Sequence, residues 1–110
     1  MTESPGAGSR PINAELQIDQ VNTTDATTVT AIVRCIRGPV RRGSRFHRIR
    51  DAAEAIDLEL TQIVIHGRPV EELDPVHTAL VTLRGTGTHR LRPGTLASGW
   101  QVVQGTNPPQ

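Results

Sequence analysis

The sequence has few of the residues that build disulfides or stack on bases. Its 110 residues include one cysteine, one phenylalanine, one tryptophan, no tyrosine and no lysine. A single cysteine excludes an internal disulfide and fits a reducing compartment, so we predict a cytoplasmic protein. So few aromatic rings leave almost no platform for stacking single-stranded bases, which excludes the RNA-recognition-motif class.

Long apolar runs and the common catalytic and metal-binding motifs are also missing. No apolar run exceeds three residues, as at 63–65, and the first residues form neither a cationic nor an apolar leader. We therefore predict neither membrane insertion nor export. The four histidines come from four separate segments, and there is no phosphate-binding glycine loop or nucleophile elbow. These absences predict no metal, no nucleotide cofactor and no enzymatic activity.

What the sequence does contain is a set of short aliphatic segments with a period of two. Residues 28–35 alternate between two faces, with Val29, Ala31, Val33 and Cys35 on one of them. Such alternation is typical of a half-buried strand. We predict similar strands at 14–21, 44–49, 58–65 and 78–83, each bounded by turn residues. A change of parity predicts a bulge near 61–62, and 51–56 predicts one helical turn at most. This pattern indicates an all-β fold, either an antiparallel barrel or a sandwich.

The predicted domain boundaries follow from proline, glycine and small polar residues near both termini. Residues 1–11 are predicted to be a disordered lead, and 104–110 a disordered tail. A single folded unit is expected over 12–103 because a chain of this length builds one core.

The charges are segregated along the chain. Residues 34–50 contain seven arginines and no acidic residue, whereas 51–74 contain seven acidic residues and one arginine. One interpretation is that neighbouring strands pair the two blocks in surface ion pairs. The other is that the arginines form a site for a polyanion or an acidic partner.

The second interpretation places the arginines around a turn and the strand that follows it. Gly38, Pro39 and Gly43 predict the turn, and alternation with Phe46 turns Arg45 outward. The candidate site residues share a position on or next to this hairpin: Arg37, Arg41, Arg42, Arg45 and Arg48. Binding through phosphates alone would be salt-sensitive and weakly sequence-specific.

Strands and glycine-containing turns follow one another in a definite order along two long segments, 27–49 and 58–98. Thr28 and Val33 lie in a strand, Gly38 and Gly43 in a turn, and Ser44 begins the next strand; an acidic turn, an apolar strand and a Gly-containing loop follow. In this order the chain resembles the second-domain β-barrel of translational GTPases such as elongation factor Tu and initiation factor 2. The resemblance implies a small closed antiparallel β-barrel and a role in translation.

The chain departs from that family in residues that carry its functions. It has no nucleotide-binding loop, and 21–27 lacks the aromatic residue and the Gly-Arg-Gly step found before the first strand in elongation factor Tu. Ala31-Ile32 replaces a strand glycine, and Pro75-Val76 stands where the family has Ala-Gly. The resemblance therefore implies no nucleotide site and no aminoacyl pocket here.

Two functions remain open from the sequence. The first is a stand-alone, non-enzymatic module that binds tRNA, other RNA or a translation-associated ribonucleoprotein through the five arginines. The alternative is a module that binds a partner protein, or a second copy of itself, through its acidic and basic faces. Cys35 is expected in the core rather than as a reactive thiol. Trp100 is interpreted either as a cap on one end of the barrel or as an exposed contact residue.

Overall fold

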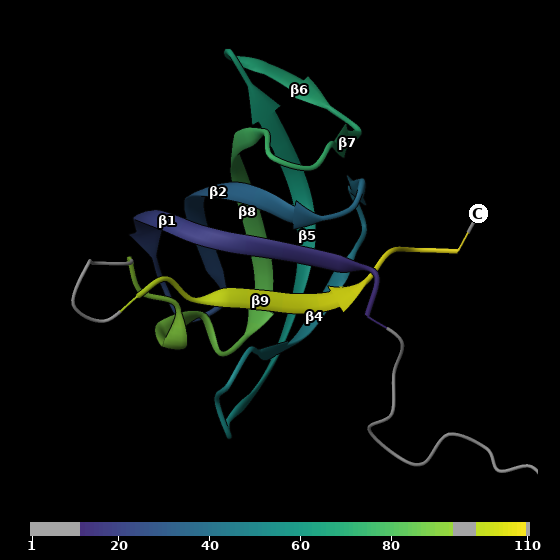
Figure 1. The fold of residues 1–110 in the computed structure, drawn as a ribbon. Coiled ribbons are helices and arrows are strands. Elements are labelled where there is room, and N and C mark those ends of the chain that lie inside the picture. The colour runs from purple at the N-terminus through teal and green to yellow at the C-terminus, as the bar shows by residue number, and fades with distance from the viewer. Residues whose placement is uncertain (1–11, 94–98, 110) are drawn as a thin grey trace, which may run out of the picture.

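The computed structural model describes residues 12–93 and 99–109, and within them the chain is built from strands. Figure 1 shows how these elements are arranged. In chain order they are β1 (Ala14–Thr24), β2 (Thr28–Arg37), β3 (Val40–Arg41), β4 (Arg45–Ile49), β5 (Ala55–Ile65), β6 (Arg68–Val70), β7 (Glu72–Leu73), β8 (Thr78–Thr86), the 3₁₀ turn η1 (Thr88–Arg90) and β9 (Val102–Thr106).

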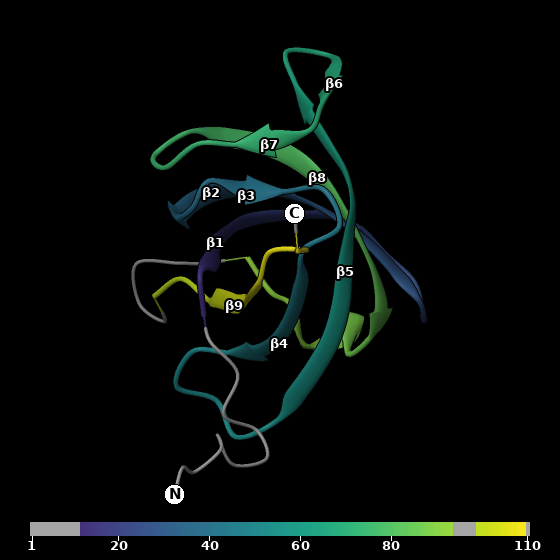
Figure 2. The same cartoon turned by 90° about the vertical axis from the view of Figure 1, so that its right-hand side faces the viewer.

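Six antiparallel strands close into a barrel. The order around the ring is β4-β9-β1-β2-β8-β5, and the pairing of β5 with β4 closes it. Figure 2 shows this ring, with β6 added to β5 above it. β3 and β7 form a separate two-stranded sheet. The all-β barrel predicted from the sequence is therefore confirmed.

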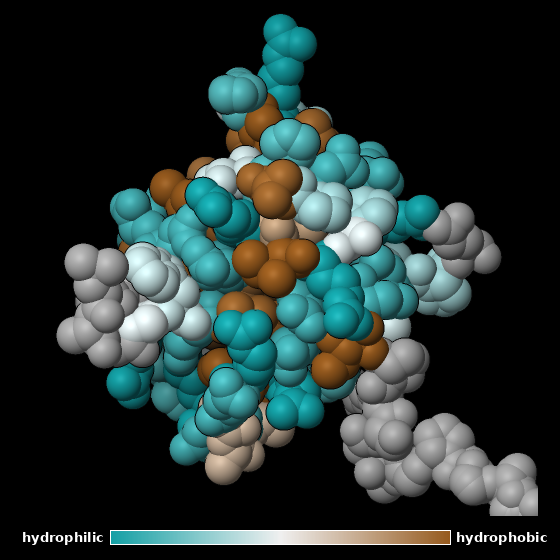
Figure 3. All heavy atoms as spheres, viewed as in Figure 1, coloured by the Kyte–Doolittle hydropathy of each residue, from teal (hydrophilic) through white to brown (hydrophobic). Residues whose placement is uncertain are grey.

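The inside of the barrel is aliphatic, as the alternation requires. Val29, Ala31, Val33 and Cys35 are each fully buried, and Phe46 is the largest buried side chain. The outside is mixed: over the face of β1, β2 and β9, apolar side chains gather along the middle and hydrophilic ones frame them (Figure 3). Closure pairs every barrel strand with two neighbours, although β1 is paired with β9 only over 14–17.

Two local predictions have different outcomes. The register of β5 against β8 shifts between Leu60 and Gln62, which confirms the predicted bulge. Within the described residues the limit of one helical turn is confirmed, but the turn is η1 at 88–90 and not 51–56, where Asp51 has a left-handed backbone (φ 63°) and Ala55 already pairs with Arg48. The capping pattern was misleading because strand pairing wins over a short helix.

The predicted end of the folded unit at residue 103 is too early. β9 continues to Thr106 and pairs with both β1 and β4. Gln104 and Gly105, assigned to a tail from the sequence, are buried. The predicted lead at 1–11 lies outside the described residues.

Candidate functional site

The arginine-bearing turn is held by the last residues of the chain. The Asn107 side chain accepts a hydrogen bond from the Arg41 amide (3.0 Å) and donates one to the Pro39 carbonyl (2.9 Å). The Ser44 hydroxyl lies 2.7 Å from the Arg41 carbonyl, and Gly43 takes the left-handed backbone (φ 98°) that returns the chain to the sheet. The turn is thus a fixed part of the barrel.

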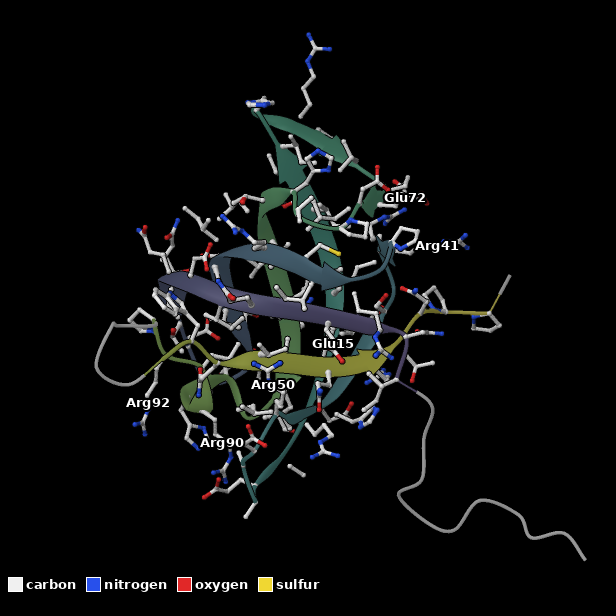
Figure 4. The ribbon with its side chains drawn as sticks, viewed as in Figure 1. Glu15, Arg41, Arg50, Glu72, Arg90 and Arg92 are labelled. Atoms are coloured by element: carbon white, nitrogen blue, oxygen red, sulfur yellow. The ribbon has the colours of Figure 1, made fainter. Side chains whose placement is uncertain are left out.

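The two arginines at the tip of this turn contact carboxylates. Because β3 pairs with β7, Arg41 lies opposite Glu72. Arg42 Nε is 2.9 Å from Glu71 Oε1, and Arg41 Nε is 3.7 Å from Glu72 Oε1. Figure 4 shows Arg41 and Glu72 close together.

Two further arginines of the predicted site are paired in the same way. Arg45 lies 2.8 Å from Asp57 and 3.7 Å from Glu59. Arg37 Nε is 3.8 Å from Glu15, and its Nη1 donates to the Ile12 carbonyl (2.9 Å). The interpretation that the basic and acidic blocks pair is therefore confirmed for Arg41, Arg42 and Arg45, whereas the partner of Arg37, Glu15, lies outside the acidic block.

These pairs cancel the charge of the predicted site. Five carboxylates lie within 4.0 Å of four of its arginines; the fifth, Arg48, is exposed and has no such carboxylate among the described residues. Each exposed pair stabilises the fold by about 0–1 kcal/mol. Their main effect is electrostatic: positive and negative groups alternate where the sequence predicts a cationic patch.

An apolar pair lies beside these ion pairs. The segments 35–41 and 72–77 run antiparallel, and the Val76 amide donates to the Cys35 carbonyl (2.8 Å). Next to this bond, Ile36 is 40% exposed and Val76 is 75% exposed. We call these two residues, with the flanking pairs Arg37–Glu15, Arg41–Glu72 and Arg42–Glu71, the Ile36–Val76 surface.

Val76 also has an unfavourable backbone. Its φ is +67°, a region that β-branched residues rarely adopt. The sequence held one signal for this, since valine stands where the resembled family has glycine. Neither burial nor backbone preference accounts for a valine at this position.

Cys35 packs in the core below this surface and has no exposed area. Burial raises the pKa of its thiol from 9.0 to about 11. The expectation of a core cysteine is confirmed.

The raised pKa predicts a stability change at alkaline pH. The unfolded thiol ionises from about pH 9, whereas the folded thiol stays protonated until about pH 11, so the free energy of unfolding should fall in that window by roughly 1 kcal/mol per pH unit. The chain has no lysine or tyrosine to titrate there. Denaturant unfolding at several pH values checks this, with Cys35→Ala as the control that should remove the slope. An equal slope in that variant would contradict the assignment.

The described residues show no group of three or more histidine, cysteine, aspartate or glutamate side chains placed to hold a metal ion. None of the described segments forms a helix long and apolar enough to cross a membrane.

Fold and surface together define a small closed six-stranded antiparallel β-barrel that presents an apolar pair among surface ion pairs. Comparisons with protein-family models, curated proteins and solved structures found no significant match.

Proposed function

We propose that this protein is a non-enzymatic binding module of the translation-factor barrel type that recognises a partner protein through the Ile36–Val76 surface. The observation that carries the proposal is Val76, which is apolar, 75% exposed and held at φ +67°. Residues kept in unfavourable backbone regions cost about 1–3 kcal/mol each and cluster at functional sites. A contact with a partner supplies a reason for this valine that the isolated fold does not.

The surroundings of Val76 indicate the chemistry of the partner. Stable interfaces have an apolar centre inside a polar rim. Here Ile36 and Val76 supply the exposed apolar side chains, and the two segments that carry them continue into the ion pairs Arg41–Glu72 and Arg42–Glu71. A protein with an apolar side chain at its centre and charges of both signs around it complements this arrangement.

The same ion pairs count against RNA as the ligand of this surface. Phosphate binding draws its affinity from unneutralised cations. The carboxylates beside Arg37, Arg41, Arg42 and Arg45 would repel a polyanion as strongly as the guanidiniums attract it. RNA binding through the hairpin therefore stays a prediction. If it is right, the binding test below should show tRNA binding that depends on salt and on Arg41 and Arg42.

The first test asks whether Val76 strains the backbone or instead supports the fold. Asparagine tolerates a left-handed backbone, so Val76→Asn should raise the free energy of unfolding by about 1 kcal/mol. Val76→Thr keeps the β-branched shape and should give no gain. Denaturant unfolding of both variants measures this difference. A loss of stability in Val76→Asn would show that the valine supports the fold.

The second test identifies the ligand. A photo-reactive residue at position 76, with one at exposed Asn22 as control, should give a protein adduct specific to position 76. The purified adduct partner should then bind the wild type at least about tenfold more tightly than Val76→Asn and Val76→Thr. Equal binding to all three would overturn the proposal, as would an adduct consisting of RNA or of a second copy of the chain. Salt-sensitive tRNA binding that is lost in Arg41→Glu/Arg42→Glu would assign the hairpin to RNA instead.

A further inference from the structure

A second surface, away from Arg41 and Glu72, carries arginines whose charge is not cancelled. Figure 4 shows Arg50 over β9 and Arg92 beyond the end of the barrel where β9 begins. A shallow pocket of about 370 Å³ lies there, lined by Arg50, Arg92 and Trp100 together with Asp51, Pro93, Gly99 and Gln101.

Hydrogen bonds hold the chain segments that carry Arg50 and Arg92 beside the segment that carries Trp100. The Arg50 amide donates to the Val102 carbonyl (2.8 Å), which joins the end of β4 to β9. The Gln101 side chain accepts from the Arg92 amide (2.6 Å) and donates to the Arg90 carbonyl (2.8 Å). Both pocket arginines are therefore bonded through their backbone to residues that follow Trp100: Arg92 to Gln101, and Arg50 to Val102.

The charge of the pocket differs from that of the hairpin. Arg90 lies 3.8 Å from Glu54, whereas Arg50 and Arg92 have no carboxylate within 4.0 Å among the described residues. Among the described residues that line the pocket, Asp51 is the single carboxylate. Two guanidiniums against one carboxylate leave a local positive charge, and guanidiniums bind phosphate in a bidentate manner.

Trp100 adds a flat apolar group to this charge. It is 43% exposed, which leaves part of the indole open to a ligand. Stacking on an aromatic ring holds a nucleic-acid base, and each ring serves one base. Because the only other such ring in the sequence is the buried Phe46, the pocket fits one nucleotide and not a run of stacked bases.

We propose that the pocket of Arg50, Arg92 and Trp100 binds a single nucleotide, with its phosphate on the guanidiniums and its base on the indole. The nucleotide is either free or the terminal residue of a strand, since both present the same chemistry. This site is separate from the Ile36–Val76 surface, so either can fail without the other.

The chain supplies its own probe for this site. Trp100 is the only tryptophan and there is no tyrosine, so intrinsic fluorescence reports on this pocket alone. Titration with AMP at low salt should quench it, and ribose 5-phosphate, which lacks a base, should bind at least about tenfold more weakly. If a 5′-phosphorylated tetranucleotide binds more tightly than AMP, the ligand is the end of a strand. If it binds equally or more weakly, the ligand is a free nucleotide.

Variants decide which residues carry the binding. Arg50→Gln and Arg92→Gln should each weaken AMP binding about tenfold or more, whereas Arg34→Gln, which removes an exposed arginine on β2, should leave it unchanged. Trp100→Leu removes the fluorescent probe, so its binding is measured by calorimetry. This variant should lose the preference for AMP over ribose 5-phosphate. Unfolding curves confirm that each variant folds. No quenching at about 10 mM AMP would overturn the proposal. The proposal would also be overturned if phenyl phosphate and AMP bound equally, or if Arg34→Gln lost as much AMP affinity as Arg50→Gln and Arg92→Gln.

Discussion

Gly105→Ala is expected to lower the free energy of unfolding by about 3 kcal/mol or more, because the added methyl group has no space. A Cβ at position 105 would lie 2.0 Å from the Arg45 carbonyl oxygen and 2.7 Å from Phe46 Cα. Both neighbours are backbone atoms of β4, which is paired on its other side with β5. Neither strand can therefore move away without opening the barrel.

The matched control is Gly67→Ala in the turn between β5 and β6. Gly67 has a left-handed backbone (φ 77°), but nothing lies within 4 Å of its added Cβ. That change should cost only the strain of alanine in this region, about 1 kcal/mol. Denaturant unfolding of both variants gives the comparison. Equal losses would mean that β9 does not approach β4 as closely as the structure shows.

Most of the barrel was predictable because alternation is a local signal. The predicted strand over 28–35 corresponds to β2, and the parity change at 61–62 to the bulge in β5. β9 was missed for a physical reason: its five residues, VVQGT, include a glycine and do not alternate. Its burial comes from β1, which lies almost ninety residues earlier in the chain, as the contact between Gln104 and Glu15 shows. Such long-range pairing leaves no local pattern.

The candidate sites were predictable only as far as charge could be counted. The sequence shows which residues are arginines and carboxylates, and one of its two interpretations paired them. Which partners meet depends on the β3–β7 and β4–β5 pairings, which place Arg41 opposite Glu72 and Arg45 opposite Glu59. The pocket of Arg50, Arg92 and Trp100 was missed because its residues come from two loops that meet only where β9 pairs with β4.

Phe46→Ala should cost about 3–5 kcal/mol, a large part of the 5–15 kcal/mol that stabilises a typical domain. Phe46 is the only phenylalanine, is fully buried, and lies between Gly105 on β9 and Leu58 on β5. The aliphatic side chains around it are anchored in paired strands and cannot close the cavity. Phe46→Leu keeps most of the volume and should cost about 1 kcal/mol. Denaturant unfolding measures both; a loss below about 1 kcal/mol for alanine would contradict this packing.

The same pair of strands predicts that the two large effects are coupled. Phe46 lies directly opposite Gly105, so both substitutions disturb one contact between β4 and β9. Residues in contact give non-additive changes, and the loss in Phe46→Ala/Gly105→Ala should be smaller than the sum of the single losses by about 1 kcal/mol or more. Because each single loss is large, the cycle is best measured by urea unfolding at low temperature with a stabilising osmolyte present throughout. Strict additivity would place the two residues in separate parts of the core, which the closed ring of six strands does not allow.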